Sequence, residues 1–144
     1  MIRKATADDS RILAEMAIQM WDSNSVDELE TEFVEMLNNG QYVFFIKYVD
    51  SKPVGFAQCS LRTDYVEGTE SSPVGYLEGV FVKENFRNMG YAKEMLFACE
   101  NWAKTMGCKE FASDCELDNV VSFKFHIAMG FDEANRIICF KKSI

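Results

Sequence analysis

The chain has 144 residues and a mass of 16.5 kDa, so we expect one continuous domain over residues 1–144. Hydrophobic residues make up 48% of the chain and charged residues 26%, which excludes an intrinsically disordered chain. Fifteen basic and 23 acidic side chains give a net charge of −8. This balance argues against a general nucleic-acid binder and is compatible with a cationic partner.

The five cysteines are odd in number and form no CxxC pair, and the only histidine is His126. This pattern offers no metal-binding spacing, so we expect no metal and reduced, mostly buried thiols, as in a cytosolic protein. The N-terminal segment lacks the apolar core of a signal peptide, and no apolar run reaches the length of a membrane span. A soluble cytoplasmic protein is therefore predicted, without a membrane partner.

The first predicted element is a short strand at residues 2–5. A helix follows, with Asp8, Asp9 or Ser10 as its N-cap and apolar residues at helical spacing behind the cap. A second helix is expected at residues 26–38. Residues 12–46 contain several acidic side chains and neither lysine nor arginine, which a solvated helix face largely explains.

The rest of the chain alternates strand and helix patterns. Aromatic and β-branched runs at residues 42–49 and 53–61 flank a short polar turn and predict an antiparallel hairpin, followed by a polar loop at 62–73. The elements expected after this loop are a strand at 74–82, a helix that ends at Gly107, a strand at 110–115, a helix at 119–129 and a strand at 136–142. This order predicts an α/β (α+β) fold with a mixed, mostly antiparallel central sheet flanked by helices.

The most specific segment runs from Val80 to Lys93. Here a strand leads into a loop with Arg87 and Gly90, and a long helix follows at once. Loop glycine lets backbone N–H groups converge, and the helix N-terminus adds unpaired donors and partial positive charge. We therefore predict a cradle for an anionic group, although an ordinary tight strand–helix connection is the alternative. Neither the GxxxxGK[ST] nor the GxGxxG pattern is present.

Two acidic residues are candidates for proton transfer. Glu78 lies within an otherwise apolar strand, where it either faces solvent or binds a substrate ammonium group and takes its proton. Strand alternation places Tyr76, Glu78 and Val80 on one face of the sheet. Asp114 ends the short strand at 110–115, where it is either a turn or capping residue or a ligand of the substrate.

Two aromatic residues lie beside acidic ones, a combination that suits a sugar-like polycation. Trp21 precedes Asp22, and Tyr65 follows Asp64. A tryptophan at the end of an amphipathic helix is more often part of the core, whereas Tyr65 lies in a polar loop.

The segment 87–92 matches the R/Q-x-x-G-x-G/A signature of the Gcn5-related N-acetyltransferases, and the segment 119–131 also sits where that family has it. Segments 64–68, 77–82 and 112–114 look like those of the aminoglycoside 6′-N-acetyltransferases. The resemblance covers essentially the whole chain.

This resemblance implies transfer of an acetyl group from acetyl-CoA to the 6′-amine of aminoglycoside antibiotics, by direct attack in a ternary complex, which confers antibiotic resistance. It also implies a homodimer. An N-acetyltransferase that acts on a protein, peptide or polyamine amine is one alternative, and a non-catalytic CoA-binding module is another.

Carried over by position, the resemblance implies that acetyl-CoA contacts Val80, Phe81, Val82, Arg87, Asn88, Gly90, Tyr91, Ala92, Lys93 and Asn119. It implies that the aminoglycoside contacts Trp21, Asn24, Tyr65, Glu78, Asp114 and Asn135. Glu78 and Asp114 are the implied catalytic residues, and a backbone N–H near Val80 would stabilise the oxyanion. Asn119 also suits a helix N-cap. Many members of the family have a proton-donating tyrosine where this chain has His126, so the proton donor stays open.

Overall fold

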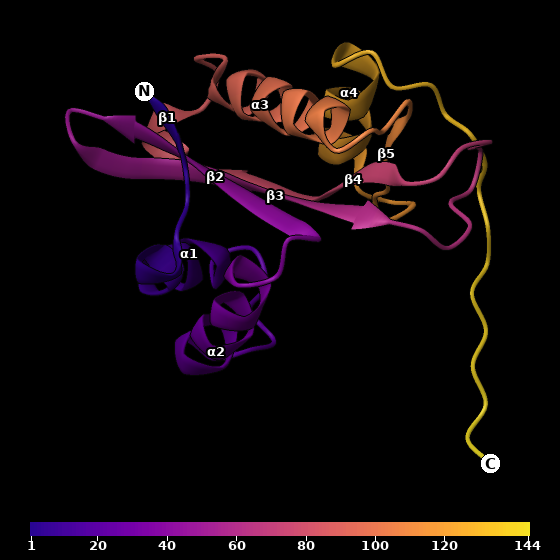
Figure 1. Cartoon of the computed structure of the whole chain (residues 1–144), viewed down its shortest axis with the longest axis horizontal. Coiled ribbons are helices and arrows are strands. Elements are labelled where there is room, and N and C mark those ends of the chain that lie inside the picture. The colour runs from indigo at the N-terminus through magenta and orange to yellow at the C-terminus, as the bar shows by residue number, and fades with distance from the viewer.

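The computed structural model describes residues 1–144 and places a five-stranded sheet between layers of helices (Figure 1). The strands lie in the order β1 (Ile2–Lys4), β2 (Tyr42–Val49), β3 (Lys52–Arg62), β4 (Val74–Val82) and β5 (Phe111–Ser113). Only β4 and β5 pair in parallel, and all other neighbours are antiparallel. The predicted mixed, mostly antiparallel sheet is confirmed.

The helices divide between the two faces of this sheet (Figure 1). Their bounds are α1 (Ser10–Ala17), α2 (Val26–Leu37), α3 (Tyr91–Thr105) and α4 (Val120–Ala128), with short 3-10 turns at Ala7–Asp9 and Glu84–Phe86. One core cluster, around Phe33, Phe44 and Phe56, joins α1 and α2 to the sheet. A second cluster joins α3 to the opposite face around Met95 and Cys99. The sheet therefore separates two distinct apolar cores.

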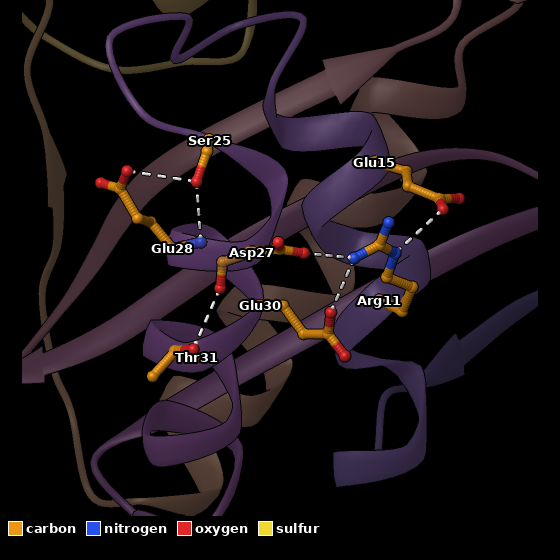
Figure 2. Close-up of polar contacts among 7 residues, drawn as sticks. All are labelled: Arg11, Glu15, Ser25, Asp27, Glu28, Glu30 and Thr31. Carbon is orange, nitrogen blue, oxygen red and sulfur yellow. Dashed lines mark hydrogen bonds and ion pairs between the residues drawn. The ribbon is translucent and has the colours of Figure 1, made fainter.

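Polar contacts fix α1 against α2, as Figure 2 shows. Arg11, directly before the acidic stretch, bonds the carboxylates of Glu15, Asp27 and Glu30 at 2.8–3.2 Å. The Ser25 side chain caps α2 by accepting the backbone N–H of Glu28 at 3.1 Å. Part of the acidic stretch is thus already paired within the chain.

A β-bulge interrupts β4 at Glu78. Gly79 pairs with Gln58 of β3 and Leu77 pairs with Cys59, so Glu78 has no partner of its own. Simple alternation therefore fails beyond this residue: Phe81 joins the core on the α1 and α2 side, whereas Val80 packs on the α3 side. The prediction that Val80 shares a face with Glu78 is wrong, because the bulge turns the strand after Glu78.

The expected last strand at residues 136–142 is also wrong. Residues 131–144 carry no helix or strand. Phe131 still packs on Phe111, and Asn135 bonds to Glu67, but Figure 1 shows the end of the chain running away from the body of the molecule. Ile138 and Phe140 are 81% and 90% exposed. The sequence has the pattern of a strand, but a strand forms only beside another strand, and no edge in this chain pairs with it.

Two further expectations concern the cysteines and membranes. Cys59, Cys99 and Cys108 are buried, Cys115 and Cys139 are exposed, and all five are free thiols. None of the helices combines the length and apolar character needed to cross a bilayer.

Candidate active site

The predicted anion cradle lies between β4 and α3. Gly90 adopts a left-handed conformation with φ of 81°, and Asn88 does so with φ of 62°. No side chain caps α3, and the first helical amide to find a backbone partner is that of Glu94, bonded to the Gly90 carbonyl at 3.1 Å. The amides of residues 91–93 therefore point out of the helix without a partner. This geometry fits a pyrophosphate group, the anion that coenzyme A carries.

Charged side chains around the cradle favour an anion. Arg87 is anchored because its Nε donates to the Val82 carbonyl at 2.8 Å. Glu94, in the first turn of α3, is paired with Lys47 at 2.6 Å, and the same ammonium lies 4.5 Å from the centre of the Tyr91 ring. The one carboxylate in the first turn of α3 is thus neutralised, and the helix N-terminus keeps its positive character.

An open strand edge adjoins the cradle. β5 pairs with β4 only from Gly75 to Leu77, so the rest of β4 has no neighbour on that side. Lys83 donates its N–H to Val54 of β3 at 2.8 Å. By alternation along β4, Val80 and Val82 direct their N–H and C=O groups away from β3, toward the open edge. An extended ligand can pair with this edge, and the Val80 N–H faces it.

A cavity of about 300 Å³ opens on the side of the sheet that α1 and α2 cover. Its lining residues are Trp21, Asn24, Leu29, Glu32, Phe33, Met36, Gln58 and Glu78. Three predicted substrate contacts, Trp21, Asn24 and Glu78, are therefore brought together. Trp21 also packs edge-on against Phe56 at 6.2 Å between ring centres, so this tryptophan belongs to both the core and the cavity wall.

Glu78 is neither free nor simply solvated. Ser60 donates to its Oε1 at 2.6 Å, and the Arg62 guanidinium donates to both carboxylate oxygens at 2.9–3.1 Å. The side chain is 25% exposed. A half-buried carboxylate at a bulge is thus held in place by two residues of β3.

Asp114 is exposed and accepts a hydrogen bond from the Tyr76 hydroxyl. Burial, reinforced by the Asp114 carboxylate, raises the pKa of Tyr76, so the phenol stays protonated and remains a donor. The Arg62 guanidinium carbon lies 3.4 Å from the centre of the Tyr76 ring. Arg62 and Tyr76 therefore connect the two predicted catalytic carboxylates, Glu78 and Asp114.

The other predicted substrate contacts lie outside this cavity. Tyr65 is 76% exposed and does not line the cavity. Asn135 donates to Glu67 at 2.8 Å, which ties the C-terminal segment to the loop between β3 and β4.

Two residues near α4 have clear local roles. The Asn119 side chain accepts the N–H of Ser122 at 3.0 Å, which confirms the N-cap interpretation. The His126 ring lies between the Ser113 hydroxyl, 2.8 Å from Nε2, and the Ser122 carbonyl, 2.7 Å from Nδ1. Ser113 in turn donates to the Leu77 carbonyl at 3.1 Å, so His126 is linked to the end of the β4–β5 pair.

Residues that the sequence reasoning missed complete the site: Ser60, Arg62, Tyr76, Glu32 and Gln58. One signal was available, because Arg62 is the only basic residue between Lys52 and Lys83. An isolated cation at the end of a strand, next to a polar loop, is a natural partner for a strand carboxylate.

The unpaired amides of the cradle, the open edge of β4 and the acidic cavity that reaches Glu78 together define an acyltransferase that draws on coenzyme A. The chain belongs to the acetyltransferase (GNAT) family, whose model matches residues 11–131. It is accordingly an N-acetyltransferase with acetyl-CoA as its co-substrate.

Within this family, the chain is similar to several aminoglycoside N(6′)-acetyltransferases. An aminoglycoside N(6′)-acetyltransferase type 1 from Salmonella typhimurium is 40% identical over 124 residues, which cover 86% of each chain. One from Stenotrophomonas maltophilia is 37% identical over 97% of this chain and 91% of that protein. The solved structure of AAC(6′)-Iy with the bisubstrate analogue CoA-S-monomethyl-acetylneamine matches with a TM-score of 0.95 and 36% identity, covering 100% and 98% of the two chains.

Proposed function

We propose that this enzyme transfers the acetyl group of acetyl-CoA to the 6′-amine of aminoglycoside antibiotics and so confers resistance to them. The observation that carries the proposal is that the cavity and the open edge of β4 adjoin each other at the bulge at Glu78. The acidic, aromatic cavity reaches Glu78, and the open edge of β4 begins directly after it, with the Val80 N–H two residues further on. An ammonium group bound in the cavity would lie next to a thioester aligned on that edge.

The chemistry follows from this arrangement. A protonated amine cannot attack, so Glu78 or Asp114 accepts its proton, directly or through water. The neutral amine then attacks the thioester carbonyl in a ternary complex, and the Val80 N–H stabilises the oxyanion that develops. Collapse of this intermediate breaks the carbon–sulfur bond, and coenzyme A leaves as its thiolate and takes up a proton. None of the residues that line the cavity is a cysteine, which favours direct attack over an acyl-enzyme. Acetyl-CoA also makes the cytoplasm the natural place of action.

Released coenzyme A, detected through its thiol, tests the proposal on a panel of amines. We expect turnover of kanamycin and tobramycin to exceed that of peptides, lysine and polyamines. Glu78→Gln or Asp114→Asn should lower turnover by roughly 10²–10⁴ for the residue that acts as the base. Asp118→Asn, an exposed acid without a role in the site, serves as the control.

Other outcomes have clear meanings. Preference for a peptide or polyamine would replace the aminoglycoside as the acceptor. Acetyl-CoA binding without turnover on any amine would indicate a binding module. Wild-type turnover in both Glu78→Gln and Asp114→Asn would contradict the assignment of the base.

We also infer that the enzyme is a homodimer in which the C-terminal segment takes part. This segment has a strand pattern, and its apolar residues Ile137, Ile138 and Phe140 are left exposed. Apolar residues exposed in this way are typical of a surface that a partner covers. Light scattering during size-exclusion chromatography should give a dimer, and Phe140→Asp should weaken it. A monomeric wild-type chain would contradict the inference.

A further inference from the structure

We propose that Arg62 occupies, in the unliganded enzyme, the position that a substrate ammonium group takes beside Glu78, so that substrate binding displaces the guanidinium. Arg62 is then a specificity-determining residue that competes with the substrate for one carboxylate. This inference rests on the proposed function, because it needs a cationic acceptor.

The geometry of the Arg62–Glu78 pair supports the view that Arg62 occupies the position of a substrate ammonium group. Arg62 donates through Nε and Nη2 to Oε1 of Glu78 at 3.1 and 2.9 Å, and through Nη2 to Oε2 at 3.0 Å. Ser60 adds a bond of 2.6 Å to Oε1. A carboxylate offers about four acceptor positions, and these contacts use most of them. An ammonium that enters the cavity therefore finds Glu78 largely occupied.

Electrostatic repulsion disfavours a substrate ammonium group and the Arg62 guanidinium beside Glu78 at the same time. Arg62 and Glu78 together are close to neutral, so an arriving ammonium meets little net attraction at this point of the cavity. It also meets a guanidinium of the same sign within a few ångströms. The substrate binds Glu78 well only if the guanidinium moves away.

Arg62 is free to move. It is the last residue of β3 and precedes the long loop to β4, and its side chain is 41% exposed. Apart from Glu78, its contact within the site is the face of the Tyr76 ring. A guanidinium that leaves Glu78 reaches water at once, so the cost of displacement is small. Ser60 stays behind and keeps Oε1 of Glu78 in place.

This exchange favours acceptors with several amines. A substrate with a single ammonium must replace the Arg62 contacts unaided. An aminoglycoside also contacts the rest of the cavity, including the Glu32 carboxylate and the Trp21 ring, and these contacts offset the displacement. Arg62 therefore raises the KM for all cationic acceptors and most strongly disfavours simple ones.

Arg62→Gln tests the proposal because glutamine keeps a planar hydrogen-bonding group without the charge. We expect the KM for tobramycin to fall about fivefold with kcat within about twofold of wild type, and the KM for a monoamine to fall further. Arg62→Lys keeps the charge and should hold the KM within about twofold of wild type. Lys104→Gln, which removes an exposed charge near the end of α3, controls for net charge and should leave both constants unchanged.

A KM that stays constant or rises in Arg62→Gln would overturn the proposal, since Arg62 would then hold Glu78 in place during catalysis. A crystal structure of the wild-type enzyme with coenzyme A and tobramycin gives an answer that needs no variant. We expect a substrate ammonium at Glu78 and the guanidinium turned to solvent. A guanidinium still bonded to both Glu78 oxygens beside bound drug would also overturn it. Failure of the wild type to acetylate any aminoglycoside would instead contradict the proposed function.

Discussion

Asp9 is a buried carboxylate that ties the first strand to the first helix. Arg3 donates to both of its oxygens at 2.7 and 2.9 Å, and the Thr6 backbone N–H donates to Oδ2 at 2.7 Å. The hydrogen bonds from Arg3, and then that from Thr6, hold the pKa of Asp9 below its ordinary value against the opposing effect of burial. The charged form of this residue is therefore the one that the fold stabilises.

We expect Asp9→Asn to lower the free energy of unfolding by about 1–3 kcal/mol at pH 7. Because the folded pKa is depressed, this contribution is fully present above the unfolded pKa of about 3.9 and is lost as the pH falls through the folded value. Urea unfolding of the wild type and of Asp9→Asn at pH 7 and at pH 3 measures the loss of stability and its dependence on pH. The neighbouring exposed Asp8 provides the control, Asp8→Asn. A difference between wild type and Asp9→Asn that persists unchanged at low pH would contradict this explanation.

Tyr76 is a second single residue with a defined contact, the hydrogen bond to Asp114. Tyr76→Phe keeps the ring under Arg62 and removes only the donor, so Asp114 loses its orientation. We expect kcat to fall about tenfold with little change in thermal stability. Since the pKa of Tyr76 is raised, the phenol does not titrate near neutral pH, and the wild-type pH–rate profile should show no transition from this residue. An unchanged kcat would mean that Asp114 needs no such partner.

At the scale of elements, local periodicity predicts well where helices and strands occur and which of the two forms. The strand at 74–82 has the same bounds in the structure, and the helix expected at 26–38 ends one residue earlier. The bulge in β4 was not predictable, because it depends on how β4 pairs with β3 and not on the local pattern. The pairing of Arg62 with Glu78 has the same origin, since two strands must be aligned before their side chains meet.

Gly79, next to the bulge, determines where the Trp21 ring lies in the cavity wall. A Cβ atom there would lie 2.7 Å from Trp21 Cζ2 and 2.8 Å from Cη2, so glycine lets the indole ring pack directly on β4. Gly79→Ala should push the ring into the cavity, raise the KM for tobramycin about tenfold and destabilise the fold by about 1–3 kcal/mol. Affinity for acetyl-CoA should hold, because Trp21 lies on the other face of the sheet from α3.

Gly40→Ala is the matched control for this substitution, since no atom lies within 4 Å of a Cβ added at Gly40. Enzyme kinetics and thermal unfolding on both variants separate the local clash from a general effect of alanine. Equal KM values for Gly79→Ala and wild type would show that the indole position does not matter for the substrate.

For the whole molecule, composition predicts the net charge but not its distribution. The chain carries −8, yet Arg11 pairs with three carboxylates of the acidic stretch, and Arg62 pairs with Glu78. Glu32 lines the cavity without an ion pair of its own. The C-terminal segment adds a second lesson: residues 136–142 have the pattern of a strand, but none forms there, because no edge of the sheet in this chain pairs with them.

The unbalanced charge predicts how the two substrates respond to salt. An aminoglycoside is multiply cationic, and the long-range field of an acidic protein attracts it, whereas acetyl-CoA is an anion held by local donors of the cradle. Raising the salt concentration from about 50 to 500 mM shortens the Debye length from roughly 14 Å to about 4 Å. The KM for tobramycin should therefore rise about threefold or more, while the KM for acetyl-CoA should change less. Steady-state kinetics across this range decides the matter: a tobramycin KM that ignores salt would mean that short-range contacts in the cavity, and not the charge of the whole molecule, bring the drug to the enzyme.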